Sequence, residues 1–336
     1  MIRRATGFGL LALALATLGC APRGIDATYG RSRGASVNGT GALAELFRRK
    51  GHEVRVARRL NPTVGAGADV LVRFAPWPGP PDRAEADWYQ AWAAESPNRR
   101  LIYVPRDFDA QSEYWAAALA RLPASADPQE KARMERQRDQ TRAWAADLPS
   151  PAKTPADVDY WFATETRPGT PAPCKTLSGP WADGIDAAAA GLTRHQVFRV
   201  DPSGGEDVLL EGDGHPLALE WLWAEGGSAL VVANGSFLLN EPLAHPARRP
   251  LALRVVRWAG EPPRRVVFVE GGDVLADEDR KPPRWPPPLN WVMPHLLAFG
   301  LVACLSRAEI LGRPRPEAPS GADRPVAHAV ALGVLL

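Results

Sequence analysis

Short runs of almost wholly apolar residues constrain the fold of this 336-residue chain more than any other sequence feature. Residues 68–75 form the first run, and residues 101–104 and 229–233 form two more. Strands that helices cover on both faces have this composition, whereas a strand with one face in water alternates apolar and polar residues. The runs therefore predict strands inside a buried, mainly parallel sheet.

The segments between the runs have the spacing of helices. Leu43, Leu46 and Phe47 recur three and four residues apart, which places them on one helical face. Asp82 and Glu85 stand three residues apart, as in the box of residues that begins many helices. Because strands and helices alternate along the chain, we expect a three-layer α/β domain.

Composition divides the chain around this domain, which we place at residues 25–275. Residues 123–180 are charged or rich in proline, and we interpret them as an insertion in the α/β domain. Within them, residues 129–147 mix both charge signs, which is typical of a solvated helix or of a docking surface for a partner. Residues 276–288 are too rich in proline to pair into a sheet, and we expect a stiff spacer there.

The N-terminus has the pattern of an export signal. Two arginines precede an apolar run over residues 7–19, and Cys20 follows the run. The sequence that ends in Cys20 is similar to a lipobox, in which the cysteine thiol carries a lipid, although Thr17 stands where leucine is usual. We therefore predict a signal or lipoprotein segment over residues 1–20, with lipidation at Cys20. The alternative is an uncleaved anchor with an incidental cysteine.

A second apolar run near the C-terminus predicts a transmembrane helix over residues 289–305, followed by a cytoplasmic tail over residues 306–336. Its length of about 25 Å as a helix is short of the roughly 30 Å hydrocarbon core, and Pro294 and His295 interrupt it. The alternative is a buried helix that ends the globular domain. The chain stops at Leu336 inside an apolar stretch, as a truncated gene product would.

The two apolar segments together predict a protein of the bacterial cell membrane whose main domain lies outside the cytoplasm. Cys174 is the only cysteine between them, so we expect no disulfide inside the domain. No Cys/His spacing is typical of zinc, and we expect neither a metal nor a cofactor. The 40 basic and 38 acidic residues nearly cancel, which argues against a nucleic-acid partner.

Four segments, taken together in this order, carry a resemblance to a known family. They are residues 29–30 with residues 36–40, residues 101–109, residues 230–240, and the tail over residues 310–315. They resemble the domain-of-unknown-function 4350 family. The resemblance implies a class I glutamine-amidotransferase-like α/β fold held at a membrane, similar to the auxiliary domains of gliding-type transport systems. It implies no catalytic residue, because the family has no established activity.

A glutamine amidotransferase needs a cysteine on a sharp strand-to-helix turn, with a histidine and an acid nearby. The strand over residues 229–233 is the natural place for that turn, but Asn234, Gly235 and Ser236 follow it. We expect Asn234 and Gly235 to make the turn and Ser236 to cap the next helix. Ser236 and Cys174 remain the alternatives as nucleophiles.

A binding crevice is the better hypothesis, because open parallel sheets bind ligands at the carboxyl ends of their strands. Polar loops over residues 36–40, 106–109 and 234–240 should gather there. A helix N-terminus suits an anion, and Arg106 suits an anionic ligand or a partner carboxylate. The alternative is that these residues form caps and turns, with Arg106 in an internal ion pair. The candidate ligand-binding residues are Ser36, Asn38, Thr40, Arg106, Asp107, Asn234, Ser236 and Asn240.

Two functions from different classes remain. The first is a non-catalytic, membrane-anchored domain that binds a ligand or scaffolds other membrane or envelope proteins, without nucleic acid. The alternative is an extracytoplasmic hydrolase with the amidotransferase-like fold, whose site lies in the same loops. A histidine within about 3.5 Å of Ser236 or Cys174 would favour the hydrolase.

Overall fold

The structure is a computed structural model. It describes residues 25–146, 162–166, 172–194, 196–199, 206–223, 226–233, 235–271 and 289–307. The chain divides into two compact units, residues 1–279 and residues 280–336, which we describe separately. The predictions for the signal segment with Cys20, for the spacer over residues 276–288 and for a tail beyond residue 307 lie outside the described residues.

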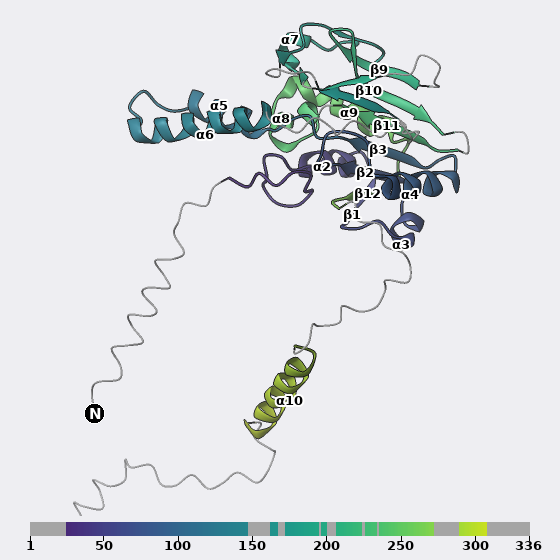
Figure 1. The fold of residues 1–336 in the computed structure, drawn as a ribbon, viewed down its shortest axis with the longest axis vertical. Coiled ribbons are helices and arrows are strands. Elements are labelled where there is room, and N and C mark those ends of the chain that lie inside the picture. Colours follow the sequence, from purple (N-terminus) through teal and green to yellow (C-terminus); the bar gives the residue numbers. More distant parts are fainter. Residues whose placement is uncertain are drawn as a thin grey trace, which may run out of the picture. The chain divides into compact units, whose positions relative to one another are not determined.

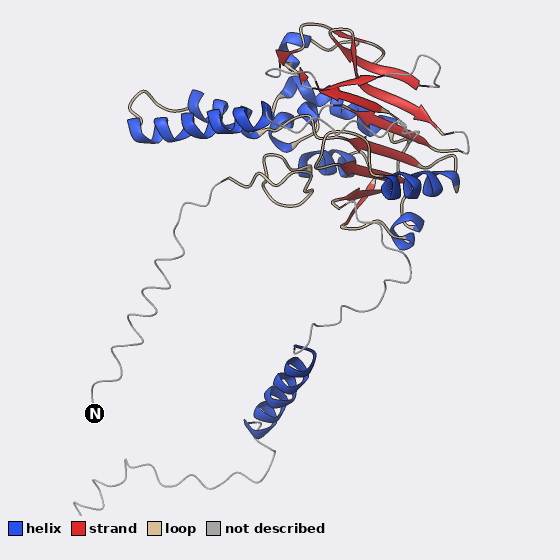
Figure 2. Ribbon diagram, in the orientation of Figure 1, coloured by secondary structure: helices blue, strands red, loops and turns tan. Residues whose placement is uncertain are grey.

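An eight-stranded sheet forms the middle layer of the first unit, as Figures 1 and 2 show. Its strands, in spatial order, are β1 (Glu53–Ala57), β12 (Arg265–Val269), β2 (Val70–Phe74), β3 (Arg100–Val104), β11 (Ser228–Val232), β10 (His215–Leu222), β9 (Glu206–Gly212) and β6 (Leu177–Ser178). The first five strands are parallel, and the last three extend the sheet in antiparallel fashion. The expected sheet is therefore present, mixed but mostly parallel.

The three apolar runs of the sequence form adjacent central strands. The run over residues 68–75 contains β2, and the runs over residues 101–104 and 229–233 contain most of β3 and β11. Every residue of β2 and of β11 is buried, because helices or loops cover both faces. This burial is the physical reason for their continuous apolar composition.

Helices cover both faces of the sheet and complete the three layers (Figure 2). One face carries α2 (Gly41–Arg49), α8 (Asn240–Ala244) and α9 (Arg249–Trp258), and the other carries α3 (Pro62–Ala66) and α4 (Arg83–Ala94). Side chains alternate between the two faces along β2, where Val72 packs with the first set of helices and Leu71 with the second. The α/β class is confirmed.

Local signals in the sequence explain how two of these helices begin and end. Asp82 Oδ1 accepts a hydrogen bond from Glu85 N at 2.8 Å, so the predicted start of α4 is confirmed. On α2, Leu43 and Phe47 are fully buried, as their spacing predicts. Gly51 follows α2 with a φ of 90°, a backbone conformation that glycine adopts without strain.

Beyond β3 the chain forms α5 (Gln111–Ala120) and α6 (Pro128–Ala146), which pack against each other. Figure 1 shows the pair projecting away from the sheet. Most of residues 129–147 lie in α6. The sequence predicts for them either a solvated helix or a docking surface for a partner. The segment over residues 123–180 also contains β6, which pairs with β9, so its end belongs to the main sheet rather than to an insertion.

Short elements lie between α6 and β9 in the sequence. They are β4 (Ala163–Thr166) paired with β8 (Gln196–Arg199), β5 (Ala172–Pro173) paired with β7 (Thr193–Arg194), and α7 (Ala187–Ala190). Both pairs are antiparallel.

The second unit contains one described helix, α10 (Leu289–Arg307). Its residues include the run for which we expect a transmembrane helix over residues 289–305. That helix is not found, since no helix in the described parts of the chain is long and apolar enough to cross a membrane. Pro294 and His295 stand inside α10 and interrupt its apolar sequence.

A candidate binding site at the carboxyl edge of the sheet

The carboxyl ends of β2 and β3 form the point where ligands bind in open α/β sheets. The chain leaves β2 toward α4, which covers one face of the sheet, and leaves β3 toward α5, which contacts α8 of the opposite face and projects away from the sheet. A crevice arises where neighbouring connections diverge in this way. The predicted loop over residues 106–109 follows β3 and lies at this edge.

The chain's own N-terminal loop, residues 25–40, fills this place. The Tyr29 ring packs edge-on against Phe74, with ring centroids 6.3 Å apart. Gly30 has a φ of 71°, and a Cβ there would come within 3.1 Å of Phe74 Cβ. Phe74 is the last residue of β2, so the loop lies directly over the end of that strand.

Asn240, at the start of α8, holds the loop on one side. Its Nδ2 donates a hydrogen bond to Ser36 O, and its Oδ1 accepts one from Ala42 N, both at 2.8 Å. Asn240 N also donates to Gly39 O at 2.8 Å. The amide of Ala42 in the first turn of α2 thus already has an acceptor, which leaves less room for the anion that we expect there.

Asn38 holds the loop on the other side. Its Nδ2 donates to Asp109 Oδ1 at 3.1 Å and its Oδ1 accepts from Ala110 N at 2.7 Å. Asn38 and Asp109 are both buried. The loop is therefore joined to the segment that follows β3.

Ser36 and Thr40 make contacts inside the loop itself. Ser36 Oγ donates to Thr28 O at 2.7 Å, and Thr40 Oγ1 donates to Gly30 O at 3.2 Å. Both residues have no exposed surface. Thr40 precedes α2 without a side-chain capping bond. These contacts correspond to the alternative in which the residues form turns.

Arg106 is partly exposed, and it forms an internal ion pair, as in the alternative stated above. Its Nη2 donates to Asp109 Oδ2 at 2.7 Å, and its guanidinium lies 4.7 Å from the centroid of the Tyr29 ring. Its side chain is 15% exposed, whereas that of Asp109 is 1% exposed. Trp77, which is 38% exposed, accepts a backbone hydrogen bond from Arg106 N at 3.0 Å. Arg106 and Trp77 together give this edge a cationic and an aromatic contact.

The Tyr29 hydroxyl adds a neutral polar group beneath Arg106. Burial raises the pKa of Tyr29 well above its usual range, and the nearby Asp107 and Asp109 add to the rise while Arg106 opposes it. Tyr29 Oη has no hydrogen-bond partner within the described part of the chain. Because the hydroxyl stays protonated, it can donate a hydrogen bond but cannot serve as a base near neutral pH.

The candidate nucleophiles are poorly placed for catalysis. Ser236 lies in η1 (Gly235–Phe237) with no exposed surface. Cys174 is buried, and burial raises the pKa of its thiol, with Asp213 adding to the rise. A raised pKa keeps the thiol protonated and unreactive, whereas a catalytic cysteine needs a lowered one. Among the described residues no group of side chains could hold a metal ion.

A second cluster of buried polar side chains lies near this edge, away from the N-terminal loop. On the opposite face of β2, Arg73 Nε donates to Glu85 Oε1 at 2.9 Å, and both side chains are at most 2% exposed. Tyr89 Oη donates to the same Glu85 oxygen at 2.8 Å. The arrangement joins β2 to α4 beneath the carboxyl edge.

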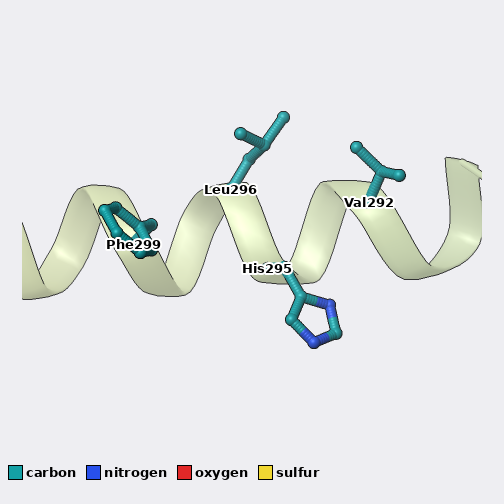
Figure 3. A pocket seen from close by; sticks show the side chains of 4 residues that line it. All are labelled: Val292, His295, Leu296 and Phe299. Carbon is teal, nitrogen blue, oxygen red and sulfur yellow. The ribbon is translucent and has the colours of Figure 1, made fainter.

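An apolar hollow lies on α10, away from the predicted loops in the sequence. It is lined by Val292, His295, Leu296 and Phe299. Figure 3 shows that these side chains come from one helix and that His295 points to the side opposite Leu296. One helix cannot enclose a small ligand, so the hollow does not form a site by itself.

The structure thus brings together Ser36, Asn38, Thr40, Arg106 and Asn240 through the N-terminal loop. Asp107 is buried in the segment after β3, and Asn234 lies outside the described residues. The candidate residues named from the sequence do not include Tyr29 or Asp109, although the predicted loop over residues 106–109 contains Asp109. The position of Asp109 in the loop after a buried strand was a usable signal, whereas nothing local to Tyr29 indicates that its ring lies under Arg106.

The described residues form an α/β protein whose sheet is mostly parallel, with a polar cluster at the carboxyl edge of that sheet. The sequence profile of the domain of unknown function DUF4350 matches residues 32–256, and the chain belongs to this family. No curated protein and no solved structure matches the chain.

Proposed function

We propose that this protein is a non-catalytic domain that binds a ligand or scaffolds a membrane or envelope partner outside the cytoplasm. The surface that does so is the carboxyl edge around Arg106 and Trp77. The supporting observation is the contrast in exposure: Arg106 and Trp77 reach solvent, while the loops beneath them are buried and joined to each other. A rigid base that carries a partly exposed arginine, here paired with Asp109, is suited to binding an anionic group.

The attachment that we propose is a lipid on Cys20, because the sequence that ends in Cys20 is similar to a lipobox. We also retain the amidotransferase-like relationship as a proposal. It rests on the segments of the sequence that resemble the family and on the alternation of strands and helices.

No observation favours the hydrolase. Ser236 has no exposed surface, and the pKa of the Cys174 thiol is shifted in the direction that opposes nucleophilic attack. A binding function requires neither residue to react.

The test is the size of the native complex extracted from cells in mild detergent. We expect the wild-type chain to migrate in a complex larger than its own 36.3 kDa. Arg106→Gln should shift it toward the monomer, while Arg121→Gln, on the exposed end of α5, should not. A monomeric wild-type chain, or a complex indifferent to Arg106, would contradict the proposal. Metabolic labelling with a fatty acid, lost in Cys20→Ala, tests the attachment separately.

A further inference from the structure

Four exposed arginines lie around the carboxyl ends of β1 and β12. They are Arg31, Arg33, Arg58 and Arg59, and we call them the arginine patch. None of them forms an ion pair with another residue in the part of the chain that the structure describes. They therefore form a positively charged surface whose charge is not consumed by salt bridges of the fold.

Hydrogen bonds join the two halves of the patch. Ser32, between the first two arginines, donates from N and Oγ to Glu270 Oε1 at 2.9 and 2.8 Å. Glu270 N in turn donates to Ala57 O at 2.8 Å, and Ala57 directly precedes Arg58. The N-terminal loop and the ends of β12 and β1 are consequently one continuous surface.

The acidic groups within this surface do not cancel its charge. Glu270 Oε1 is engaged by Ser32, and Asp26 Oδ1 accepts hydrogen bonds from Thr28 N and Oγ1 at 3.0 and 2.7 Å. Among the described residues of this surface, four arginines against these two carboxylates leave an excess of two positive charges, and Arg31 is near enough to Asp26 to help lower the pKa of that carboxyl. Such an excess is attracted to anionic surfaces.

The path of the chain places this surface close to the predicted lipid. Asp26 O accepts a hydrogen bond from Val37 N at 3.0 Å, so the chain is fixed to the carboxyl edge from its first described residues. Cys20 lies only five residues before Ile25. Five fully extended residues span at most about 17 Å, so a lipid on Cys20 would hold the carboxyl edge near the bilayer surface.

We infer that the arginine patch docks on anionic phospholipid headgroups of the membrane that holds the Cys20 lipid. The inference rests on the membrane attachment proposed above. A lipid chain and a basic patch act together in peripheral proteins, because the chain supplies insertion and the patch supplies attraction to anionic lipid. Each arginine near an anionic surface strengthens binding by about fivefold. The docked domain presents its carboxyl edge, with Arg106 and Trp77, to the membrane surface.

The experiment uses the full chain with Cys20→Ala, so that binding no longer depends on the lipid. Co-sedimentation compares vesicles of phosphatidylcholine alone with vesicles that contain about one third phosphatidylglycerol. Binding to the neutral vesicles measures the contribution of the apolar segments. The ratio of binding to anionic vesicles over binding to neutral vesicles measures the contribution of charge. We expect the Cys20→Ala chain to prefer anionic vesicles, with a preference that falls as salt rises.

The decisive variants remove equal charge from two places. Replacing the four patch arginines by glutamine should reduce the preference for anionic vesicles at least tenfold. The matched control replaces Arg121, Lys131, Arg136 and Arg142, which are exposed on α5 and α6, and should change the preference less than twofold. Thermal unfolding of both variants checks that they fold.

Three results would overturn the inference. The first is a patch variant that keeps its preference for anionic vesicles, and the second is a control variant that loses as much of it. The third is a preference that emerges only when Asp273, Asp277, Glu278 and Asp279 are neutralised, because the chain's own acidic segment would then be the occupant. Absence of fatty-acid label on Cys20 would instead contradict the proposed attachment. The ratio of binding to the two kinds of vesicle does not depend on that label, so the two failures can be distinguished.

Discussion

Gly30 occupies a position at the carboxyl edge where a side chain would be strained. Its φ of 71° favours glycine, and a Cβ would come within 3.1 Å of Phe74 Cβ. We expect Gly30→Ala to lower the free energy of unfolding by about 2 kcal/mol, from backbone strain and from the displaced Phe74. Urea denaturation measures the loss. Gly184→Ala is the matched control, since Gly184 has a φ of 68° but open space around it; an equal loss in both would show that the contact with Phe74 is unimportant.

The buried pair of Arg73 and Glu85 gives a second prediction at the residue scale. Glu85→Ala leaves the Arg73 guanidinium buried without its carboxylate, and should destabilise the fold by about 3–5 kcal/mol. The double variant Arg73→Leu with Glu85→Leu removes both charges and should recover much of that loss. Chemical denaturation of the single and double variants checks this. A double variant as unstable as Glu85→Ala would contradict this account, because the loss would then not come from an unpaired buried charge.

Asp69 supplies a prediction for pH dependence. Hydrogen bonding from the Arg265 side chain holds the pKa of Asp69 below its usual 3.8, with Asp69 Oδ1 and Arg265 Nη2 2.7 Å apart. A lowered pKa in the folded state means that the stabilisation is present above pH 3.8 and is lost as pH falls below it. Because the pair is partly exposed, Asp69→Asn should cost only about 1 kcal/mol at pH 7 and almost nothing at the lowest pH. Unfolding free energies across the acidic range test this; a constant difference would contradict it.

At the scale of elements, Asn240 connects α8 to α2 through the N-terminal loop. Its amide group serves Ser36 O and Ala42 N, and both would lose their partner in Asn240→Ala. We expect a loss of about 2 kcal/mol in the free energy of unfolding, since buried polar groups without partners are costly. Hydrogen exchange should accelerate in residues 25–42 and remain slow in β2. Asn61→Ala, which removes the cap of α3, is the control and should leave the loop protected. Acceleration confined to α8 would contradict the account.

Central strands could be predicted from sequence, because burial on both faces determines their composition directly. β2 and β11 are continuous apolar runs for that reason. The antiparallel pairing of β10 with β11 and with β9 could not be predicted, since its register depends on tertiary contacts. β6 lies in a segment interpreted as an insertion, because two residues with one partner strand leave almost no pattern.

At the scale of the whole molecule, the position of the site followed from topology more than from motifs. The loops over residues 36–40, 106–109 and 234–240 could be placed at one edge because parallel strands share a direction. What sequence could not show is that the N-terminal loop lies over β2 and engages most of the candidate residues itself. Hydrogen bonds such as that of Asn38 with Asp109 join residues 71 positions apart, and no local pattern encodes them.

The central claim is that the carboxyl edge is the binding surface, and cross-linking in intact cells tests it most directly. A photoreactive residue at Trp77, which is 38% exposed at that edge, is compared with one at Leu222, which is 61% exposed at the end of β10 beside the start of β11. The account predicts a discrete cross-linked product from Trp77 that Arg106→Gln diminishes, and none from Leu222. Equal products from both positions, or a product from Leu222 alone, would contradict it.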